Sequence, residues 1–398
     1  MKPRILYVAW TPPSKQSGAT LAMRRHLLEH DDFEVFVVTS GELDDPSIPN
    51  LRVSNPPWLD RLGRTRLWKF VRNFEMLAWS RRVTEEMLKV AREFDPDVIL
   101  TVADLTLSEA ARRLALRLHK PLICNFQDWW PRGQFFFQAE RPFPPLVPLF
   151  ERRFRRLCEQ SALAFCTSEG MKEFLGAHPN SHVLYPICSN EPLPVYEPPT
   201  PRIGKRRLLY TGTAFGAYGR MLLGLADLLK TNPDWELVIY GAEPDWPPSV
   251  IRAARDTGLY RGFLPFEKLK EELRQADACL AVMSFENQLE TMMRTSFTTK
   301  FLDYCAAGRP VILWGPSYCS PSMLAKREKA ALVVETPEAE AVVAQLRRLS
   351  DATLFEQLCE GSRGLAKGVL SHGQIHDVFV SNIRALVGKK TLGHDVPS

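Results

Sequence analysis

Short apolar runs alternate with amphipathic helical patterns along the whole 398-residue chain, and this alternation restricts the fold more than any other feature. The runs at 5–10 and 35–39 are almost continuously apolar, and a helical pattern at 19–29 lies between them. Strands with this composition belong to parallel sheets, because helices cover both faces of such sheets. The sequence therefore predicts an α/β fold that opens with a βαβ unit of the doubly wound kind.

A proline-rich segment divides this alternation into two halves. The strand and helix pattern stops near residue 185 and restarts at Arg207, and the segment between holds Pro192, Pro194, Pro198, Pro199 and Pro201. A segment of this composition is a semi-rigid linker. We therefore expect one domain at 1–185, a linker at 186–206, a second domain at 207–370, and a final helix with a tail at 371–398.

Composition excludes several classes of protein. The 51 basic and 46 acidic residues give a net charge of only +5, which does not indicate nucleic acid binding. The eight cysteines are scattered without Cys-x-x-Cys or zinc-type spacing, so we expect a reduced, cytoplasmic protein with no metal site. The first apolar run is too short for a signal peptide, and no apolar stretch approaches the ~20 residues that span a bilayer. Any membrane contact must be peripheral.

Two segments mix arginines with large apolar residues. A long helical region is predicted at about 65–94. The first residues of this region and those just before it are basic and aromatic. A second basic helix is predicted at 150–157. Both have two interpretations. They either contact an anionic membrane surface, or they are solvated basic faces over an ordinary core stripe.

The stretch 298–312 predicts a helix, a stop and a strand. Phe301, Leu302 and Cys305 share one helical face, whereas Thr299, Lys300 and Asp303 share another. Gly308 is a natural helix stop, and the apolar residues from Val311 read as a buried strand. One face is expected to pack and the other to bind a ligand. The alternative is that Lys300 and Asp303 form an ordinary surface ion pair.

This stretch resembles the "P-T-K-x-x-E-Y-x-A-x-G-K-P-V" helix of GT-B glycosyltransferases, retaining family 4. The resemblance implies two Rossmann-like domains that face a cleft, with the last helix crossing back to the first domain. It also implies a hexosyltransferase-like enzyme that transfers a sugar from a nucleotide sugar to a hydroxyl, with retention. The acceptor is expected to be a saccharide or a lipid-linked glycan of cell-envelope polysaccharide biosynthesis. The enzyme is expected in the cytoplasm or at the inner face of the membrane.

The donor residues follow from the same resemblance. Asp303 stands where the family carries a glutamate that binds the ribose hydroxyls, and Lys300 and Arg220 are expected to neutralise the diphosphate. The segment 260–265 resembles a short strand whose backbone pairs with the base. The expected donor-binding residues are Gly18, Gly212, Thr213, Gly241, Glu243, Phe263, Thr299 and Asp303. Neither a cofactor nor a metal is expected, because positive side chains normally replace a metal in this fold.

The acceptor side is expected after the strand at 122–125, where the sequence resembles the family's "D-L-W-P" run. Asp128 is expected to contact acceptor or sugar hydroxyls, or alternatively to cap the next helix. The segment from Ser168 resembles the family's "S-E-G-M" turn and also reads as a helix N-cap. The expected catalytic residues are Asp128, Lys300 and Arg220, and the expected acceptor or sugar contacts are Gln127, Trp129, Ser168 and Glu290.

The first glutamate of the family motif is missing. It should lie eight residues before Asp303, where this chain has Thr295, and Glu286 or Glu290 is a substitute only if the loop is remodelled. This departure keeps two alternatives open: a catalytically degenerate protein that binds a sugar or nucleotide, and a nucleotide-sugar epimerase.

Overall fold

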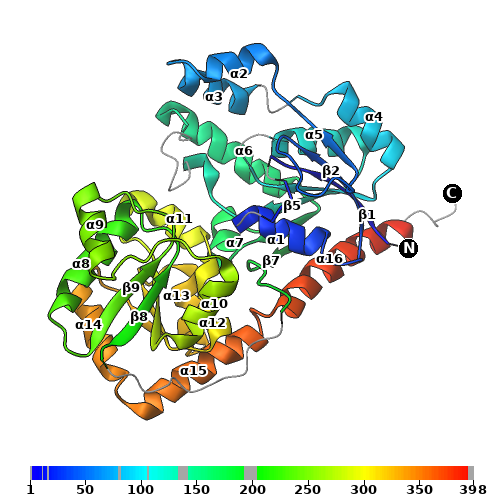
Figure 1. The fold of residues 1–398 in the computed structure, drawn as a ribbon. Helices are drawn as coiled ribbons and strands as arrows, with labels where there is room; N and C mark the ends of the chain where they lie inside the picture. The colour runs from blue at the N-terminus through cyan, green and yellow to red at the C-terminus, as the bar shows by residue number, and fades with distance from the viewer. Residues whose placement is uncertain are drawn as a thin grey trace. The chain divides into compact units, whose positions relative to one another are not determined.

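The computed structural model describes residues 2–10, 12–15, 18–78, 82–104, 107–132, 142–191 and 204–392 (Figure 1). They form two compact units, Met1–Ser189 with Ile375–Ser398, and Asn190–Gln374. Most of the proline-rich segment, at 192–203, and the tail at 393–398 lie outside the described residues.

The first unit is built on a parallel sheet of seven strands in the order β3-β2-β1-β4-β5-β6-β7. Its strands are β1 (Arg4–Val8), β2 (Glu34–Thr39), β3 (Asn50–Arg52), β4 (Val98–Val102), β5 (Leu122–Phe126), β6 (Leu163–Cys166) and β7 (Ser181–Val183). All residues of β4 and β5 are buried. This burial explains their continuously apolar sequences, and the predicted doubly wound fold is confirmed.

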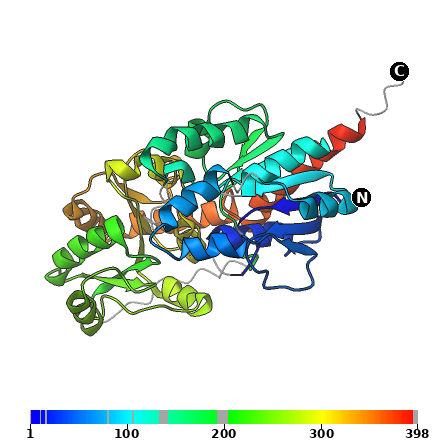
Figure 2. The same ribbon diagram turned by 90° about the horizontal axis from the view of Figure 1, so that it is seen from above.

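In the sequence, the helices of the first unit come between these strands. They are α1 (Gly18–Leu27), α2 (Pro57–Gly63), α3 (Trp68–Leu77), α4 (Glu85–Phe94), α5 (Leu107–Leu118), α6 (Val147–Glu159) and α7 (Glu169–Leu175). The last helix, α16 (His372–Leu392), belongs to this unit from Ile375 onward. Figures 1 and 2 both show this red helix beside the blue elements of the N-terminal unit.

The single long helix predicted at 65–94 is wrong, because the chain forms separate helices there. Leu67 N–H bonds to Thr65 Oγ1 at 3.1 Å in the turn that precedes α3, and α3 ends at Leu77. Thr84 then caps a new helix, α4, by accepting the Met87 N–H at 3.1 Å. A continuous apolar and basic pattern cannot reveal such breaks, since capping is a local effect of one or two side chains.

The second unit has a parallel sheet of five strands in the order β12-β11-β10-β8-β9. The strands are β8 (Arg206–Thr211), β9 (Trp235–Tyr240), β10 (Ala278–Val282), β11 (Val311–Trp314) and β12 (Leu332–Val334). Its helices are α8 (Gly216–Lys230), α9 (Pro248–Asp256), α10 (Phe266–Gln275), α11 (Glu290–Thr295), α12 (Thr299–Ala307), α13 (Ser320–Arg327), α14 (Ala339–Arg348) and α15 (Ala352–Lys367).

Two local predictions in this unit need correction. The segment 260–265 is not a strand, because it makes only an isolated parallel bridge between Ile239 and Tyr260. The glycines at 212, 216 and 219 predict a loop over 212–220 followed by a helix at 221–229, but α8 begins at Gly216, so Arg220 lies on the helix. Within the described residues, no helix combines the length and apolar character needed to span a membrane.

Candidate functional site

The carboxyl ends of β8 and β9 bring two glycine backbones into very close contact. Gly212 N–H bonds to Tyr240 O at 2.7 Å, and Gly241 N–H bonds to Gly262 O at 2.9 Å. A Cβ added at Gly241 would lie 2.0 Å from Gly212 O, so a side chain does not fit there. Ligands of open α/β sheets bind outside this edge, and the close approach of the two backbones requires glycine at both positions.

Lys300 projects from the first turn of α12 toward this edge. A Cβ added at Gly212 would lie 2.1 Å from Lys300 Cε, so the lysine stem crosses directly over that glycine. Lys300 Nζ lies 5.3 Å from the ring centre of Tyr210 and 5.9 Å from that of Tyr218. Burial lowers the pKa of Lys300 to about 8, while the nearby Asp303 carboxylate opposes this shift. Lys300 is half-buried, and a partly desolvated ammonium at the edge of a sheet favours an anionic ligand.

The rest of α12 fixes this lysine in place. Phe301, Leu302 and Cys305 are buried, as the sequence predicts, whereas Thr299 is exposed and Asp303 half-buried. The buried Tyr304 hydroxyl accepts the N–H of Thr211, the last residue of β8, at 2.9 Å. The helix ends at Gly308, whose φ of 67° is left-handed. Thr299, Lys300 and Asp303 are thus held on a helix that is bonded to the strand next to the site.

Arg220 and Glu286 form an ion pair in this unit. The hydrogen bond from Gln288, and then the one from Arg220, hold the pKa of Glu286 below its usual value. Glu290 pairs with Arg294 at 2.9 Å. Each carboxylate that the sequence offers as a substitute for the missing glutamate is therefore paired with an arginine.

Three of the candidate positions make local contacts with neighbouring residues, and a fourth is exposed. Thr295 is fully buried and donates to Thr291 O at 2.8 Å, so it is part of the packing of α11. Glu243 pairs with Arg255 at 2.5 Å, and Thr213 O accepts the Tyr210 hydroxyl at 2.6 Å. Phe263 is 75% exposed. The contacts described so far bring together Gly212, Gly241 and Lys300.

In the first unit, Gln127, Asp128 and Trp129 follow β5. Gln127 and Asp128 are half-buried, and Gln127 Oε1 is a buried atom without a hydrogen-bond partner among the described residues. Trp129 is only 2% exposed and packs edge-to-face on Phe154 and Phe174, with ring centres 4.7 Å apart in each case. Its indole is part of the core, so the expectation that Trp129 contacts the acceptor or the sugar is wrong.

Ser168 and Gly18 are both at helix N-termini. Ser168 is fully buried and caps α7 by accepting the Met171 N–H at 3.0 Å. The predicted capping role is thus confirmed, and the buried hydroxyl has no surface for an acceptor. Gly18 begins α1 with φ of 55°, and a Cβ placed on it would meet no atom within 4 Å. This left-handed backbone favours glycine there, and the space around it is open.

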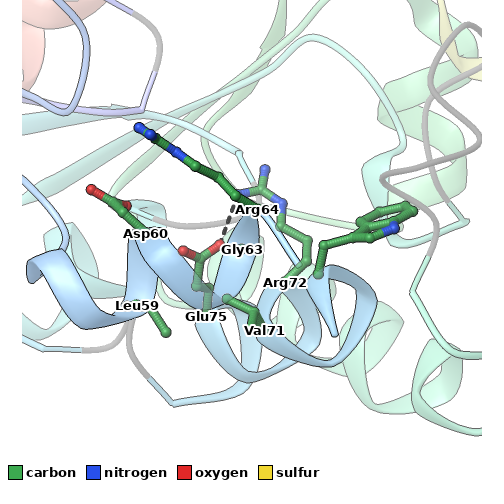
Figure 3. A pocket seen from close by; sticks show the side chains of 8 residues that line it. Leu59, Asp60, Gly63, Arg64, Val71, Arg72 and Glu75 are labelled. Atoms are coloured by element: carbon green, nitrogen blue, oxygen red, sulfur yellow. Dashed lines mark hydrogen bonds and ion pairs between the residues drawn. The ribbon is translucent and has the colours of Figure 1, made fainter. Parts of the chain in front are cut away.

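The sequence did not identify a cavity between α2 and α3, shown in Figure 3. It has a volume of about 530 Å³ and is lined by Leu59, Asp60, Gly63, Arg64, Trp68, Val71, Arg72 and Glu75. Arg72 bonds to Glu75 at 3.2 Å, and its guanidinium lies 4.9 Å from the ring centre of Trp10, just beyond β1. Glu75 also lines a second cavity of about 730 Å³ that includes Trp10. In the sequence, only the mixture of arginines with large apolar residues indicates that this region is unusual.

The α2–α3 segment also exposes several large apolar side chains. Among the described residues, Trp58 is 50%, Leu62 38%, Leu67 51%, Phe70 63% and Phe74 43% exposed. The same segment carries Arg61, Arg64, Arg66, Lys69 and Arg72. Exposed apolar groups next to cations are typical of surfaces that meet another molecule.

Comparisons with known proteins match both halves of the chain. The family model described as Glycosyltransferase Family 4 matches residues 19–189, and the one described as Glycosyl transferases group 1 matches residues 206–352. A search of curated proteins found no match.

Several solved structures share the fold over nearly the full length. HepE from Anabaena, solved in complex with UDP, is 13% identical with a TM-score of 0.67, covering 97% of this chain and 100% of that one. Sucrose-phosphate synthase from Thermosynechococcus elongatus is 15% identical with a TM-score of 0.65, covering 98% and 100%. A glycosyltransferase from Rickettsia africae is 12% identical with a TM-score of 0.68, covering 97% and 99%.

At these identities the solved structures show the fold alone, whereas the two family models also carry the activity class. The models match consecutive parts of the chain, one in each compact unit, and both describe glycosyltransferases. This chain therefore belongs to the GT-B glycosyltransferases of the family 4 kind.

Proposed function

We propose that this glycosyltransferase takes its sugar from a nucleoside diphosphate sugar and transfers it to a hydroxyl group with retention of configuration. The observation that carries the proposal is the half-buried ammonium of Lys300, held over Gly212 at the carboxyl edge of the second sheet. Asp303 follows on the same helix. HepE, which has a similar fold, has been solved with UDP and with UDP-glucose, and this supports a nucleotide donor.

Each residue has a defined task in this proposal. When the bond between the sugar and the diphosphate breaks, negative charge develops on the leaving oxygen, and the Lys300 ammonium stabilises it. Arg220 contributes a second positive charge after its pair with Glu286 rearranges. The Asp303 carboxylate accepts hydrogen bonds from the ribose hydroxyls, and Asp128 orients the sugar or the acceptor hydroxyl. Positive side chains perform the charge stabilisation, so the proposed transfer is independent of a metal.

The acceptor is proposed to be a saccharide carried on a lipid and to bind in the first unit. The cavity between α2 and α3 presents Arg64 to polar or anionic groups (Figure 3), and Trp68 and the Glu75-paired Arg72 also line it. The exposed apolar residues of α2 and α3 lie next to cations, which is the combination that attracts a protein to an anionic membrane. A lipid-linked acceptor would be presented at such a surface.

The test of the donor is thermal stabilisation of the purified protein by a panel of nucleoside diphosphates and nucleotide sugars. A ligand at ~100 times its dissociation constant should add about 2.7 kcal/mol to the free energy of unfolding. Lys300→Gln and Asp303→Asn should lose this stabilisation. Lys268→Gln, which changes an exposed lysine on α10, should keep it. If no nucleotide stabilises the wild-type protein, the proposed donor is wrong.

A second candidate is a protein that binds the nucleotide sugar without transferring it. The Arg220–Glu286 ion pair and the buried Thr295 favour this candidate, because Arg220 is bound to a carboxylate and Thr295 stands in place of the family's first glutamate. Incubation of the stabilising nucleotide sugar with candidate acceptors, analysed by mass spectrometry, separates the two. A glycoside product with the donor's anomeric configuration supports transfer, whereas binding without product supports the second candidate. An isomerised donor sugar would indicate an epimerase.

A further inference from the structure

Two histidines and an aspartate meet where the last helix packs on the first unit. His30 and Asp32 lie in the connection between α1 and β2, and His376 lies on α16. One nitrogen or oxygen atom of each side chain lies within 4.8 Å of those of the other two. Figure 1 shows α16 running past α1 in this region. Residues 32 and 376 are 344 positions apart, so only the folded chain assembles this group.

We propose that His30, Asp32 and His376 bind a divalent transition metal ion, with Zn²⁺ as the preferred ion. Two imidazoles and one carboxylate are ligands that zinc accepts, and three protein ligands leave the fourth tetrahedral position for water. His376 Nε2 and Asp32 Oδ2 are 3.0 Å apart, close to the separation of two ligand atoms on one tetrahedral zinc ion. His30 and Asp32 are half-buried, so solvent reaches the open side of the group.

The surrounding residues orient these ligands. Arg384 donates to Asp32 Oδ1 at 2.8 Å, which leaves Oδ2 directed at His376. On the other side of the His376 ring, its Nδ1 lies 3.3 Å from Nδ1 of His26, which is 1% exposed. A metal on Nε2 places the ring proton on Nδ1, where His26 is positioned to accept it. Protein metal sites generally hold their histidine ligands through such a partner.

One ligand must move for the metal to bind. The His30 ring is stacked on His376, with ring centres 3.8 Å apart and an angle of 21° between the planes. Since a ring nitrogen binds a metal in the plane of its ring, His30 has to turn until its nitrogen points toward the group. His30 is half-buried, whereas the buried His376 is held by Asp32 and His26.

The proposed ion would act as a clip rather than as a catalyst. It would join the α1–β2 connection to α16 and so fasten the C-terminal helix to the first unit, in addition to the packing of Phe379 on His26 and Phe33. The site shares no residue with the proposed donor site. The inference is therefore independent of the proposed function, and its test requires no nucleotide.

The experiment is a titration of the full-length, tag-free protein with ZnCl2 after treatment with a chelator. Wild type should bind one equivalent of Zn²⁺ at this site and show a higher Tm when saturated. His30→Gln and Asp32→Asn should bind this equivalent at least about tenfold more weakly and lose the shift in Tm. His182→Gln, which changes a half-buried histidine on β7, should behave as wild type. Equal zinc affinity in wild type and Asp32→Asn would overturn the proposal.

Cysteines also bind zinc, so the type of ligand has to be identified directly. The absorption spectrum of the wild-type protein with Co²⁺ in place of Zn²⁺ does this without a variant. Tetrahedral Co²⁺ bands without a thiolate-to-cobalt charge-transfer band are the expected result. A thiolate band would place the metal on one of the cysteines, of which Cys188 is the one that the structure leaves partly exposed, and would overturn the proposal. This measurement also decides the question if the ligand variants do not fold.

Discussion

Lys300 and Gly212 are in direct contact at the end of β8, where a Cβ on the glycine would lie 2.1 Å from Lys300 Cε and 2.9 Å from Nζ. The glycine also has φ of 109°, a conformation that other residues rarely adopt. The lysine is therefore placed over the sheet edge by the absence of a side chain at residue 212. Several consequences of this contact can be measured.

Gly212→Ala should lower both stability and nucleotide affinity. The unfavourable backbone conformation should cost about 1–3 kcal/mol in the free energy of unfolding, and the new methyl group should displace the Lys300 stem. Urea unfolding measures the first effect and nucleotide titration the second. Gly224→Ala is the matched control, since Gly224 lies on the exposed side of α8 with no atom within 4 Å of a new Cβ. It should stabilise the protein by about 0.5–1 kcal/mol without changing affinity.

Nucleotide-sugar affinity should fall as the pH rises above about 8. Burial lowers the pKa of Lys300 to about 8 in the free protein, and a bound diphosphate should raise this pKa because it stabilises the ammonium. Binding then takes up a proton between the two pKa values, so affinity is highest below pH 8 and falls by up to about tenfold per pH unit above it. Calorimetric titration from pH 7.5 to 9.5 tests this. The slope should disappear in Lys300→Arg, and an unchanged slope in that variant would contradict the assignment to Lys300.

Lys300→Met should make the ligand-free protein more stable at pH 7. The pKa of Lys300 falls from 10.5 in the unfolded chain to about 8 on folding, so the unfolded chain binds more protons between these values. The cost of burying the charge is fully present below pH 8 and disappears as the pH rises toward 10.5. We expect a gain of about 1 kcal/mol at pH 7, much less than the full shift because solvent reaches the side chain. Lys268→Met, on an exposed face, should change stability little.

How much of this site follows from the sequence depends on how local each feature is. The limits and two faces of α12 follow from residues 298–312 alone, because helical periodicity and a glycine stop are local signals. The position of Lys300 over Gly212 and the pairing of Arg220 with Glu286 join distant segments, and the sequence gives no signal of either. The burial of Trp129 depends on α6 and α7 packing against it, so its chemistry in the sequence suggested a binding surface that the fold covers.

Glu286→Gln should separate two roles of the Arg220–Glu286 pair. The Arg220 side chain is 67% exposed and the Glu286 side chain 31%. Loss of this ion pair should therefore change the free energy of unfolding by less than about 1 kcal/mol. A released Arg220 should bind a nucleoside diphosphate several-fold more tightly, whereas Arg220→Gln should weaken this binding about tenfold. If Glu286 contacts the transferred sugar, Glu286→Gln should also reduce sugar transfer despite the tighter binding. Weaker binding of the diphosphate by Glu286→Gln would show that the pair itself builds the site.

Replacing Leu67 and Phe70 together by serine should release the protein from anionic membranes. These side chains are 51% and 63% exposed on the α2–α3 segment, next to Arg66 and Lys69, and transfer of both into the interface should contribute at least about 1.4 kcal/mol, or tenfold in partitioning. Sedimentation with vesicles of phosphatidylglycerol and phosphatidylcholine measures the bound fraction. Leu116→Ser is the control, because Leu116 is 57% exposed on α5, outside the α2–α3 segment.

Salt and lipid charge distinguish the two parts of this interaction. Cations near an anionic surface contribute about 1 kcal/mol each, and this contribution weakens as salt shortens the Debye length. Wild-type binding should therefore fall with added salt and be lost on pure phosphatidylcholine vesicles, while the serine variant should bind weakly at every salt concentration. If wild type and the serine variant sediment equally with anionic vesicles, the exposed apolar side chains do not enter the membrane, and the acceptor need not be lipid-linked.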